Sequence, residues 1–252
     1  MIAAAALALS LAAPTRVVSM APCLTDDVLA LGEGKRLVAV SRFDDEPELG
    51  RLPRVGGYLD PDVEAVVRAR PDLVLSLDGE AERPVLAALR RVGLTVVALR
   101  SDTLPEILDD VVAVAEALGE RQRGERLRGE LERELAAAAK AGARRRTVIA
   151  VDYRPLVVAG RGSYLEQLLE AVGSANAVAS PLAWPTFSAE AFAAQPPEVW
   201  IDGGPPGEPE GEKLLGLLRS EGTRVVRLPN ADLFRASPRA VAAARELAAA
   251  LR

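Results

Sequence analysis

The chain contains two blocks in which short Val- and Leu-rich runs alternate with amphipathic segments, and this alternation restricts the fold more than any other feature. Apolar runs without polar alternation are typical of strands buried on both faces, and helical patterns between them are typical of parallel sheets. The runs read RVVSM, RLVAVS, PDLVLSL and TVVAL in the first block, and RTVIAVD, PEVWIDGG and TRVVRLP in the second. The sequence therefore predicts two α/β units of the parallel-sheet type.

Residues 104–142 separate the two blocks and carry helical periodicity with dense charge. As one helix, this segment would extend for about 55 to 60 Å. We therefore predict an α/β fold of two parallel-sheet lobes, 14–103 and 143–252, bridged by a long rigid α-helix at 104–142, with a ligand cleft between the lobes. Gly119 offers a break in this helix, and a two-helix hairpin packed on one lobe is the alternative.

A stretch of the first block recurs in the second. Residues 57–74 read GYLDPDVEAVVRARPDLV, and at an offset of 126 positions residues 183–200 read AWPTFSAEAFAAQPPEVW, with an aromatic residue, a glutamate and a proline–acid pair at matching positions. Any two strand entries of the proline–acid type look alike, which is the alternative to a true repeat. The ungapped match of all three features favours two equivalent lobes.

Composition excludes several classes of function. The net charge of −5 and the pI near 5.1 provide no basic surface for nucleic acid. The chain has no histidine, which excludes a Ser-His-Asp triad and any histidine-ligated zinc, manganese or haem iron. The single cysteine, Cys23, cannot form an internal disulfide.

The first residues, 1–13, form a short apolar run that ends in small residues. This resembles the apolar core and cleavage region of a secretory signal, although a basic start is missing, and the run is too short to span a membrane. We expect an exported, periplasmic protein. A frayed alanine-rich helix is the alternative.

Aromatic residues are scarce, and four of the nine fall in expected loops: Phe43, Tyr58, Trp184 and Phe234. If the two lobes face each other, Tyr58 and Trp184 become opposing walls of the cleft. Scarce aromatic residues placed away from the core indicate a flat or bulky apolar ligand. Asp232 and Arg235 are close enough in sequence to bond one another and a ligand amide or carboxylate. A surface ion pair is the alternative for these two.

The order RVVSMAPCLTDDVLALG, PRVGGY, VEAVVRARPDLVLS, AWPTFSAEAFAAQPPEVWIDGG and DLFRASPR resembles the periplasmic cobalamin-binding proteins of bacterial ABC importers. These belong to the substrate-binding proteins whose lobes are joined by a rigid helix. The resemblance covers the chain from Arg16 onward. It implies a non-enzymatic protein that carries cobalamin or a related corrinoid as its transported ligand, with no resident cofactor or metal. The positions that it implies for ligand contact are Cys23, Phe43, Tyr58, Leu77, Val157, Trp184, Asp232 and Arg235.

The resemblance also gives the repeated glutamates a role. It implies that Glu64 and Glu190 dock a monomeric binding protein onto arginines of the ABC transporter permease dimer. A two-fold partner offers two equivalent basic pockets, which suits equivalent acids on the two lobes. The alternative is that both glutamates simply favour the first turn of a helix, an effect of about 0.3 to 1 kcal/mol.

Three pocket positions depart from the family pattern, because Tyr58, Leu77 and Val157 stand where tryptophan or phenylalanine is expected. A wider, less aromatic pocket leaves cobinamide, another corrinoid, haem or a ferric siderophore as alternative ligands. Cys23 could approach a ligand metal, but a buried cysteine is more often a small hydrophobe. An enzyme that uses Asp44, Asp45 and Glu46, or Asp152 with Asp232, is the second class of function. Acid runs of this kind are usually solvated.

Overall fold

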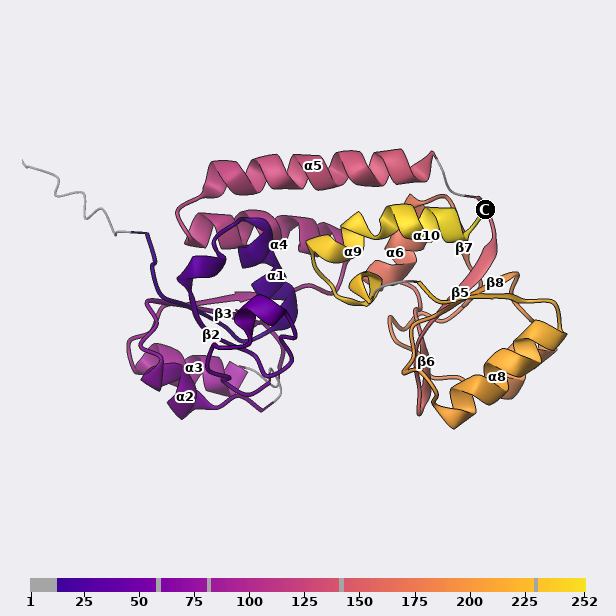
Figure 1. Ribbon diagram of the computed structural model, residues 1–252, viewed down its shortest axis with the longest axis horizontal. Coiled ribbons are helices and arrows are strands. Elements are labelled where there is room, and N and C mark those ends of the chain that lie inside the picture. Colours follow the sequence, from indigo (N-terminus) through magenta and orange to yellow (C-terminus); the bar gives the residue numbers. More distant parts are fainter. Residues whose placement is uncertain (1–12, 58–59, 81–82, 141–142, 229–230) are drawn as a thin grey trace, which may run out of the picture.

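The computed structural model describes residues 13–57, 60–80, 83–140, 143–228 and 231–252. Two α/β lobes lie side by side, and helices run along one side of both (Figure 1). The two-lobed α/β architecture is therefore as predicted. Tyr58 and residues 1–12 of the signal-like segment lie outside the described residues.

The N-terminal lobe is built on a parallel four-stranded sheet in the order β2-β1-β3-β4. One face packs on α1 and α4, and the other on α2 and α3, so the strands are apolar on both sides as expected for a covered parallel sheet. The elements are β1 (Val17–Ser19), α1 (Pro22–Ala30), η1 (Gly34–Arg36), β2 (Leu37–Val40), η2 (Pro47–Leu49), α2 (Val63–Arg68), β3 (Leu73–Leu77), α3 (Arg83–Arg91) and β4 (Val96–Leu99).

The C-terminal lobe has a sheet in the order β6-β5-β8-β9, with β7 paired to β5. All pairings are parallel except that of β5 with β6, which form an antiparallel hairpin. The elements are β5 (Arg146–Tyr153), β6 (Leu156–Val158), α6 (Tyr164–Ala171), β7 (Ala175–Asn176), α7 (Ala189–Ala194), β8 (Val199–Asp202), α8 (Pro209–Ser220), β9 (Arg224–Val226), η3 (Asp232–Phe234), α9 (Pro238–Ala242) and α10 (Ala244–Ala250).

The repeated stretch folds into the same helix–strand pair in both lobes. Helix α2 and helix α7 begin 126 positions apart, as do β3 and β8. Each strand is the third in its sheet, beside β1 in one lobe and β5 in the other. The in-register repeat read from the sequence is thus a repeat of structure.

The connection between the lobes corrects one prediction. It is not a single helix but a hairpin of α4 (Leu104–Ala117) and α5 (Arg121–Ala139) (Figure 1). The alternative was right about the two helices but wrong about their placement, because the hairpin reaches both lobes and does not pack on one alone. Helix α4 ends at Leu118, and Gly119 follows with φ +77°. Glycine adopts this left-handed conformation without the steric cost that a side chain carries, so the chain turns back here.

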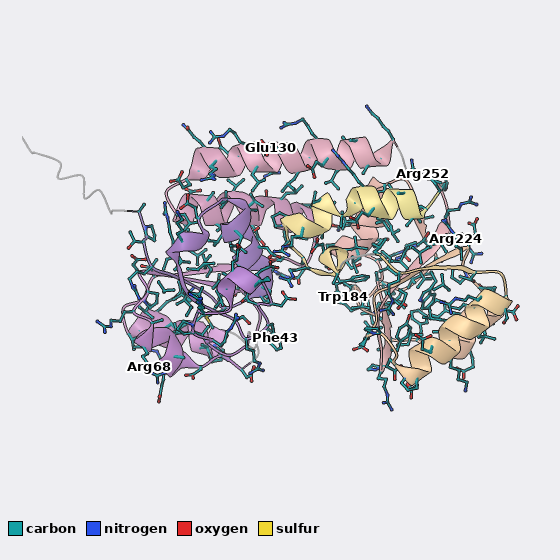
Figure 2. The ribbon with its side chains drawn as sticks, viewed as in Figure 1. Phe43, Arg68, Glu130, Trp184, Arg224 and Arg252 are labelled. Atoms are coloured by element: carbon teal, nitrogen blue, oxygen red, sulfur yellow. The ribbon has the colours of Figure 1, made fainter. Side chains whose placement is uncertain are left out.

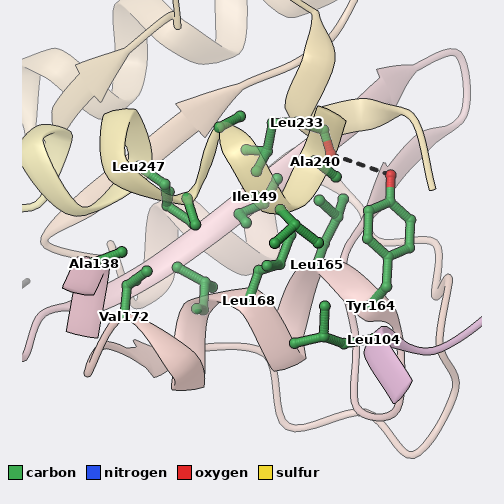
Figure 3. Close-up of a cluster of buried hydrophobic side chains, with 14 of the residues drawn as sticks. Leu104, Ala138, Ile149, Tyr164, Leu165, Leu168, Val172, Leu233, Ala240 and Leu247 are labelled. Carbon is green, nitrogen blue, oxygen red and sulfur yellow. Dashed lines mark hydrogen bonds between the residues drawn. The ribbon is translucent and has the colours of Figure 1, made fainter. Parts of the chain in front are cut away.

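Both helices of the hairpin reach both lobes. Helix α4 begins at the C-terminal lobe, where the Leu104 N–H donates to Gln167 Oε1 at 2.6 Å, and ends at the N-terminal lobe, where Arg36 donates to the Leu118 carbonyl at 2.7 Å. Helix α5 runs back and buries Ala138 in the core of the C-terminal lobe (Figure 3). Two packed helices make a stiffer bridge than one. Within the described ranges, no helix has the length and apolar composition needed to cross a membrane.

Candidate functional site

The carboxyl ends of the parallel strands in both lobes lie at the junction between the lobes. Open α/β sheets bind ligands at the carboxyl ends of their strands. Two hollows open among these strand ends, on either side of residues 232–236. The junction hollow, of about 260 Å³, is lined by residues after β3 and β4 and by Cys23 and Ala236. The C-lobe hollow, of about 440 Å³, is lined by residues at the ends of β5, β8 and β9 and by Phe234.

Two predicted contact residues, Cys23 and Leu77, meet in the junction hollow. Cys23 lies in the first turn of α1 and Leu77 is the last residue of β3. Burial, with a smaller contribution from the charge of Asp27, raises the pKa of the Cys23 thiol to about 12. The group is therefore a neutral thiol at pH 7 and not the thiolate that ligates metals. This agrees with the reading of Cys23 as a small hydrophobic residue.

Phe234 lies in η3 and lines the C-lobe hollow. Its ring rests directly on the backbone at Gly203, where an added Cβ would come within 2.2 Å of two ring carbons. Only glycine permits this approach, so the GG pair after β8 sets the depth to which Phe234 enters the lobe.

Phe43 and Trp184 are the only aromatic side chains, among the residues that the structure describes, that are largely exposed, at 51% and 41%. Phe43 follows β2 and Trp184 precedes α7. Figure 2 shows Phe43 on the N-terminal lobe and Trp184 on the C-terminal lobe, on the sides that face each other. Val157, at the centre of β6, is half-buried and pairs through an isolated bridge with Thr186, close to Trp184 in sequence.

Tyr164 was not found by sequence reasoning. Its ring meets the Trp184 indole edge-on, with centroids 5.9 Å apart, and its hydroxyl donates to the Leu233 carbonyl (Figure 3). The tyrosine therefore fixes Trp184 and η3 relative to each other. The available signal was the motif GSYLEQ, in which a capping serine, Ser163, places an aromatic residue at the start of a helix.

Arg235 does not pair with the side chain expected from its sequence. Its guanidinium reaches into the N-terminal lobe and contacts Asp45 at 2.6 Å and Asp26 at 3.5 Å. Asp232 instead contacts Arg239 at 3.5 Å. The two proposed ligand handles thus belong to a larger charge network that joins the lobes.

This network, here called the interlobe clamp, has a buried carboxylate at its centre. Asp26 is only 2% exposed, and it accepts from the Ser237 hydroxyl at 2.9 Å and contacts Arg239 Nε at 3.0 Å. Burial raises the pKa of Asp26 above its ordinary value, although Arg235, Ser237 and Arg239 all favour the ionised form. The members of the clamp are Asp26, Asp45, Glu46, Asp232, Arg235, Ser237 and Arg239.

The acid run FDDEP is solvated only in part, because Asp45 is exposed but Asp44 and Glu46 are not. Asp44 is buried, and burial raises its pKa to about 6. Asp45 and Glu46 are held by clamp arginines. The reason is tertiary, because Arg235, which follows η3, and Arg239, which lies in α9, come from the other lobe and contact this loop. Within the described part of the chain, no group of three or more His, Cys, Asp or Glu side chains is placed to hold a metal ion.

Two further acids are buried where α1 packs on α4. Asp27 has a pKa well above its ordinary value, because of burial first and then the charges of Asp110 and Asp26. Burial raises the pKa of Asp110 to about 7, although the Ser101 hydroxyl donates to it at 2.7 Å. These carboxyls make the lobe–bridge contact sensitive to pH.

We expect the protein to become less stable as the pH rises from 4 to 7, because of Asp110. The unfolded chain ionises this group near 3.8 and the folded protein near 7, so unfolding releases a proton between these values. The unfolding free energy therefore falls as pH rises, by a few kcal/mol (about 1.4 kcal/mol per pH unit at most). Asp110→Asn, which removes the titration, is expected to be more stable than the wild type at pH 8 and to show a flatter profile. Urea unfolding at pH 4.5, 6 and 8 measures both, and parallel profiles would contradict the assignment.

Glu64 and Glu190 occupy the same position, the second residue, in α2 and α7. Both are exposed. Helix α2 lies on the side of the N-terminal lobe away from α5, and α7 packs on α8, which lies on the same side of the other lobe (Figure 1). The repeat thus presents one carboxylate from each lobe at a shared side of the molecule, remote from α5.

Comparisons with known proteins agree with this architecture. The family model described as "Periplasmic binding protein" matches residues 17–221. The vitamin B12-binding protein of Salmonella typhimurium is 32% identical over 251 residues, which cover 95% of this chain and 91% of that protein.

Two solved structures have the same fold. The periplasmic heme-binding protein RhuT from Roseiflexus sp. RS-1, in apo form, aligns with a TM-score of 0.81 and 26% identity, over 94% of this chain and 97% of that one. The periplasmic vitamin B12-binding protein BtuF of Vibrio cholerae aligns with a TM-score of 0.78 and 23% identity, over 94% and 96% of the two chains.

Proposed function

Because this chain belongs to the periplasmic binding protein family, we propose that it captures cobalamin or a related corrinoid between its two lobes and delivers it to an ABC import permease. The protein acts in the periplasm as a monomer without catalysis, and the corrinoid is its cargo. The observation that carries the proposal is the pair of exposed aromatic side chains, Phe43 and Trp184, on facing walls. A corrin ring has two broad apolar faces, which such walls cover.

The bridge and the clamp support a mechanism of small-amplitude closure. The α4–α5 hairpin and the buried ion pairs of Asp26 oppose a wide swing of the lobes. Ligand therefore enters a largely preformed site, and release follows when the docked transporter parts the lobes. The clamp residues Asp232 and Arg235 lie beside the site and offer polar contacts at its rim.

A haem carrier is the second candidate, because a heme-binding protein aligns with this chain at a TM-score of 0.81 and 26% identity. Parallel calorimetric titrations with cyanocobalamin, dicyanocobinamide and haemin separate the two. We expect tight one-to-one binding of at least one of the two corrinoids and weaker binding of haemin. Binding of haemin alone would transfer the function to haem transport.

Replacing both Glu64 and Glu190 by glutamine is expected to impair delivery to the permease without impairing corrinoid capture. Glu64 and Glu190 line neither hollow and are not among the predicted ligand contacts, so corrinoid affinity in the double variant should stay within about twofold of the wild type. Affinity for the permease complex in nanodiscs should fall by roughly tenfold or more, since two charge contacts are lost.

The matched control is Glu130→Gln with Glu132→Gln, which removes the same charge from α5 on the opposite side (Figure 2). This control should bind the permease normally. A double Glu64 and Glu190 variant that lost corrinoid binding would contradict the separation of roles.

A further inference from the structure

Three charged side chains with no part in the proposed function so far line the C-lobe hollow: Asp152, Asp202 and Arg227. Asp152 lies near the end of β5 and pairs across the hairpin with Val157, so the two side chains project from the same face of the sheet. A β-bulge between Ala150 and Asp152 shifts the register here and turns Asp152 away from the core that buries Ala150. The carboxylate is thereby directed to the wall that carries a predicted ligand contact.

One oxygen of Asp152 is held by the protein and the other is available. Oδ1 accepts from the backbone N–H of Tyr153 at 2.7 Å and of Arg154 at 3.2 Å. These bonds fix the orientation of the carboxylate. Within the described residues, Oδ2 has no hydrogen-bond donor. The group is thus a positioned acceptor at the edge of the hollow.

Arg227 is already neutralised by a buried partner. Its Nε and Nη2 donate to Asp202 Oδ2 at 3.1 and 2.5 Å, and Asp202 is only 4% exposed. The other oxygen of Asp202 accepts from the Tyr153 hydroxyl at 2.7 Å. The Arg227 side chain is 41% exposed, and no bond of its Nη1 to another described residue is seen, so Arg227 can still donate to a ligand. Together, Asp152, Asp202 and Arg227 give the lining of the hollow a net charge of −1.

A hollow with a free carboxylate acceptor, a neutralised guanidinium donor and net negative charge suits a neutral group that both donates and accepts. A primary carboxamide is such a group, because its NH₂ donates and its carbonyl accepts. A ligand carboxylate has no hydrogen to donate to Asp152. Its negative charge would also be repelled by the negative charge of Asp152, which disfavours binding.

We propose that the C-lobe hollow is a carboxamide subsite, in which Asp152 accepts from ligand amides, Arg227 donates to ligand amides, and carboxylate side chains are rejected. The proposal rests on the proposed function and deepens it. Corrinoids carry carboxamide side chains on the ring edge, whereas haem carries propionates. The subsite therefore selects amidated corrinoids against carboxylate-bearing tetrapyrroles.

The test compares dicyanocobinamide, whose ring side chains are amides, with dicyanocobyrinic acid, in which they are carboxylic acids. Wild-type protein is expected to prefer the amide by roughly 100-fold. In Asp152→Asn, which retains an acceptor for the two backbone N–H groups but loses the charge, this preference should shrink by roughly tenfold. Asp109→Asn, which removes one charge from exposed Asp109 on α4, should leave the preference unchanged.

The outcomes separate the two proposals. Equal affinity of wild-type protein for the two ligands would overturn the subsite and leave corrinoid capture standing, and this comparison needs no variant. An unchanged preference in a folded Asp152→Asn protein, as judged by thermal melting, would also overturn it. Failure of cyanocobalamin and dicyanocobinamide to bind at all would overturn the proposed function together with the subsite.

Discussion

Trp184→Ala is expected to weaken cyanocobalamin binding by roughly 30-fold or more, which corresponds to about 2 kcal/mol or more. Trp184 is 41% exposed, yet its indole is held in place. Tyr164 packs against its edge, and the backbone on both sides is bonded to β6 and the residues that follow it, through Gly160 N–H to the Ala183 carbonyl and Val158 N–H to the Pro185 carbonyl. A preorganised aromatic wall loses little entropy on binding, so its removal costs most of its contact energy.

Isothermal titration calorimetry measures this effect. Leu182→Ala is the matched control, because Leu182 is a 62% exposed apolar residue of the same loop and is not one of the predicted ligand contacts. The control should bind within about threefold of the wild type, and Trp184→Phe should retain most of the affinity. A Trp184→Ala protein that binds as tightly as the control would remove this residue from the site.

Arg239→Met is expected to lower the unfolding free energy by about 2 to 4 kcal/mol. The guanidinium contacts Asp26 at 3.0 Å, Glu46 at 2.6 Å and Asp232 at 3.5 Å. Methionine keeps most of the apolar stem but leaves the buried Asp26 with only the longer contact to Arg235 and the Ser237 hydroxyl. A buried carboxylate with lost partners destabilises the folded state strongly.

Arg128→Met is the control for this variant, because Arg128 also pairs with more than one acid, Asp109 and Glu132, and is similarly exposed. Those acids are exposed, so its loss should cost less than about 1 kcal/mol. Urea unfolding at pH 7 measures both variants. Equal losses in the two would show that the interlobe clamp is no stronger than a surface ion pair.

Local patterns were sufficient to predict most of the fold. The βα alternation identified both sheets because burial on two faces demands unbroken apolar runs, and the repeat predicted matching pairs, α2–β3 and α7–β8. The single connecting helix was wrong because periodicity does not reveal whether a chain continues past a glycine or turns back.

The candidate site was predicted less completely. Exposed aromatic residues in loops could be read from the sequence, and Phe43 and Trp184 do lie at the junction. Tyr164 escaped notice because its place at the start of a helix is equally typical of an ordinary core residue. Asp152 was singled out only as a possible catalytic acid, because the bulge that directs it to the C-lobe hollow has no sequence signal of its own.

The sequence by itself determined most strands and helices of the two lobes, the two-lobe plan and the equivalence of Glu64 and Glu190, since each follows from the order of residues within short segments. Only the tertiary structure decided the partners of the charged groups. Arg235 meets Asp26 across 209 positions of sequence, and Asp26 is buried by helices of the opposite lobe. Charge attraction acts between any neighbouring acid and base, so the pairing depends on which groups the packing of the lobes brings together and removes from water.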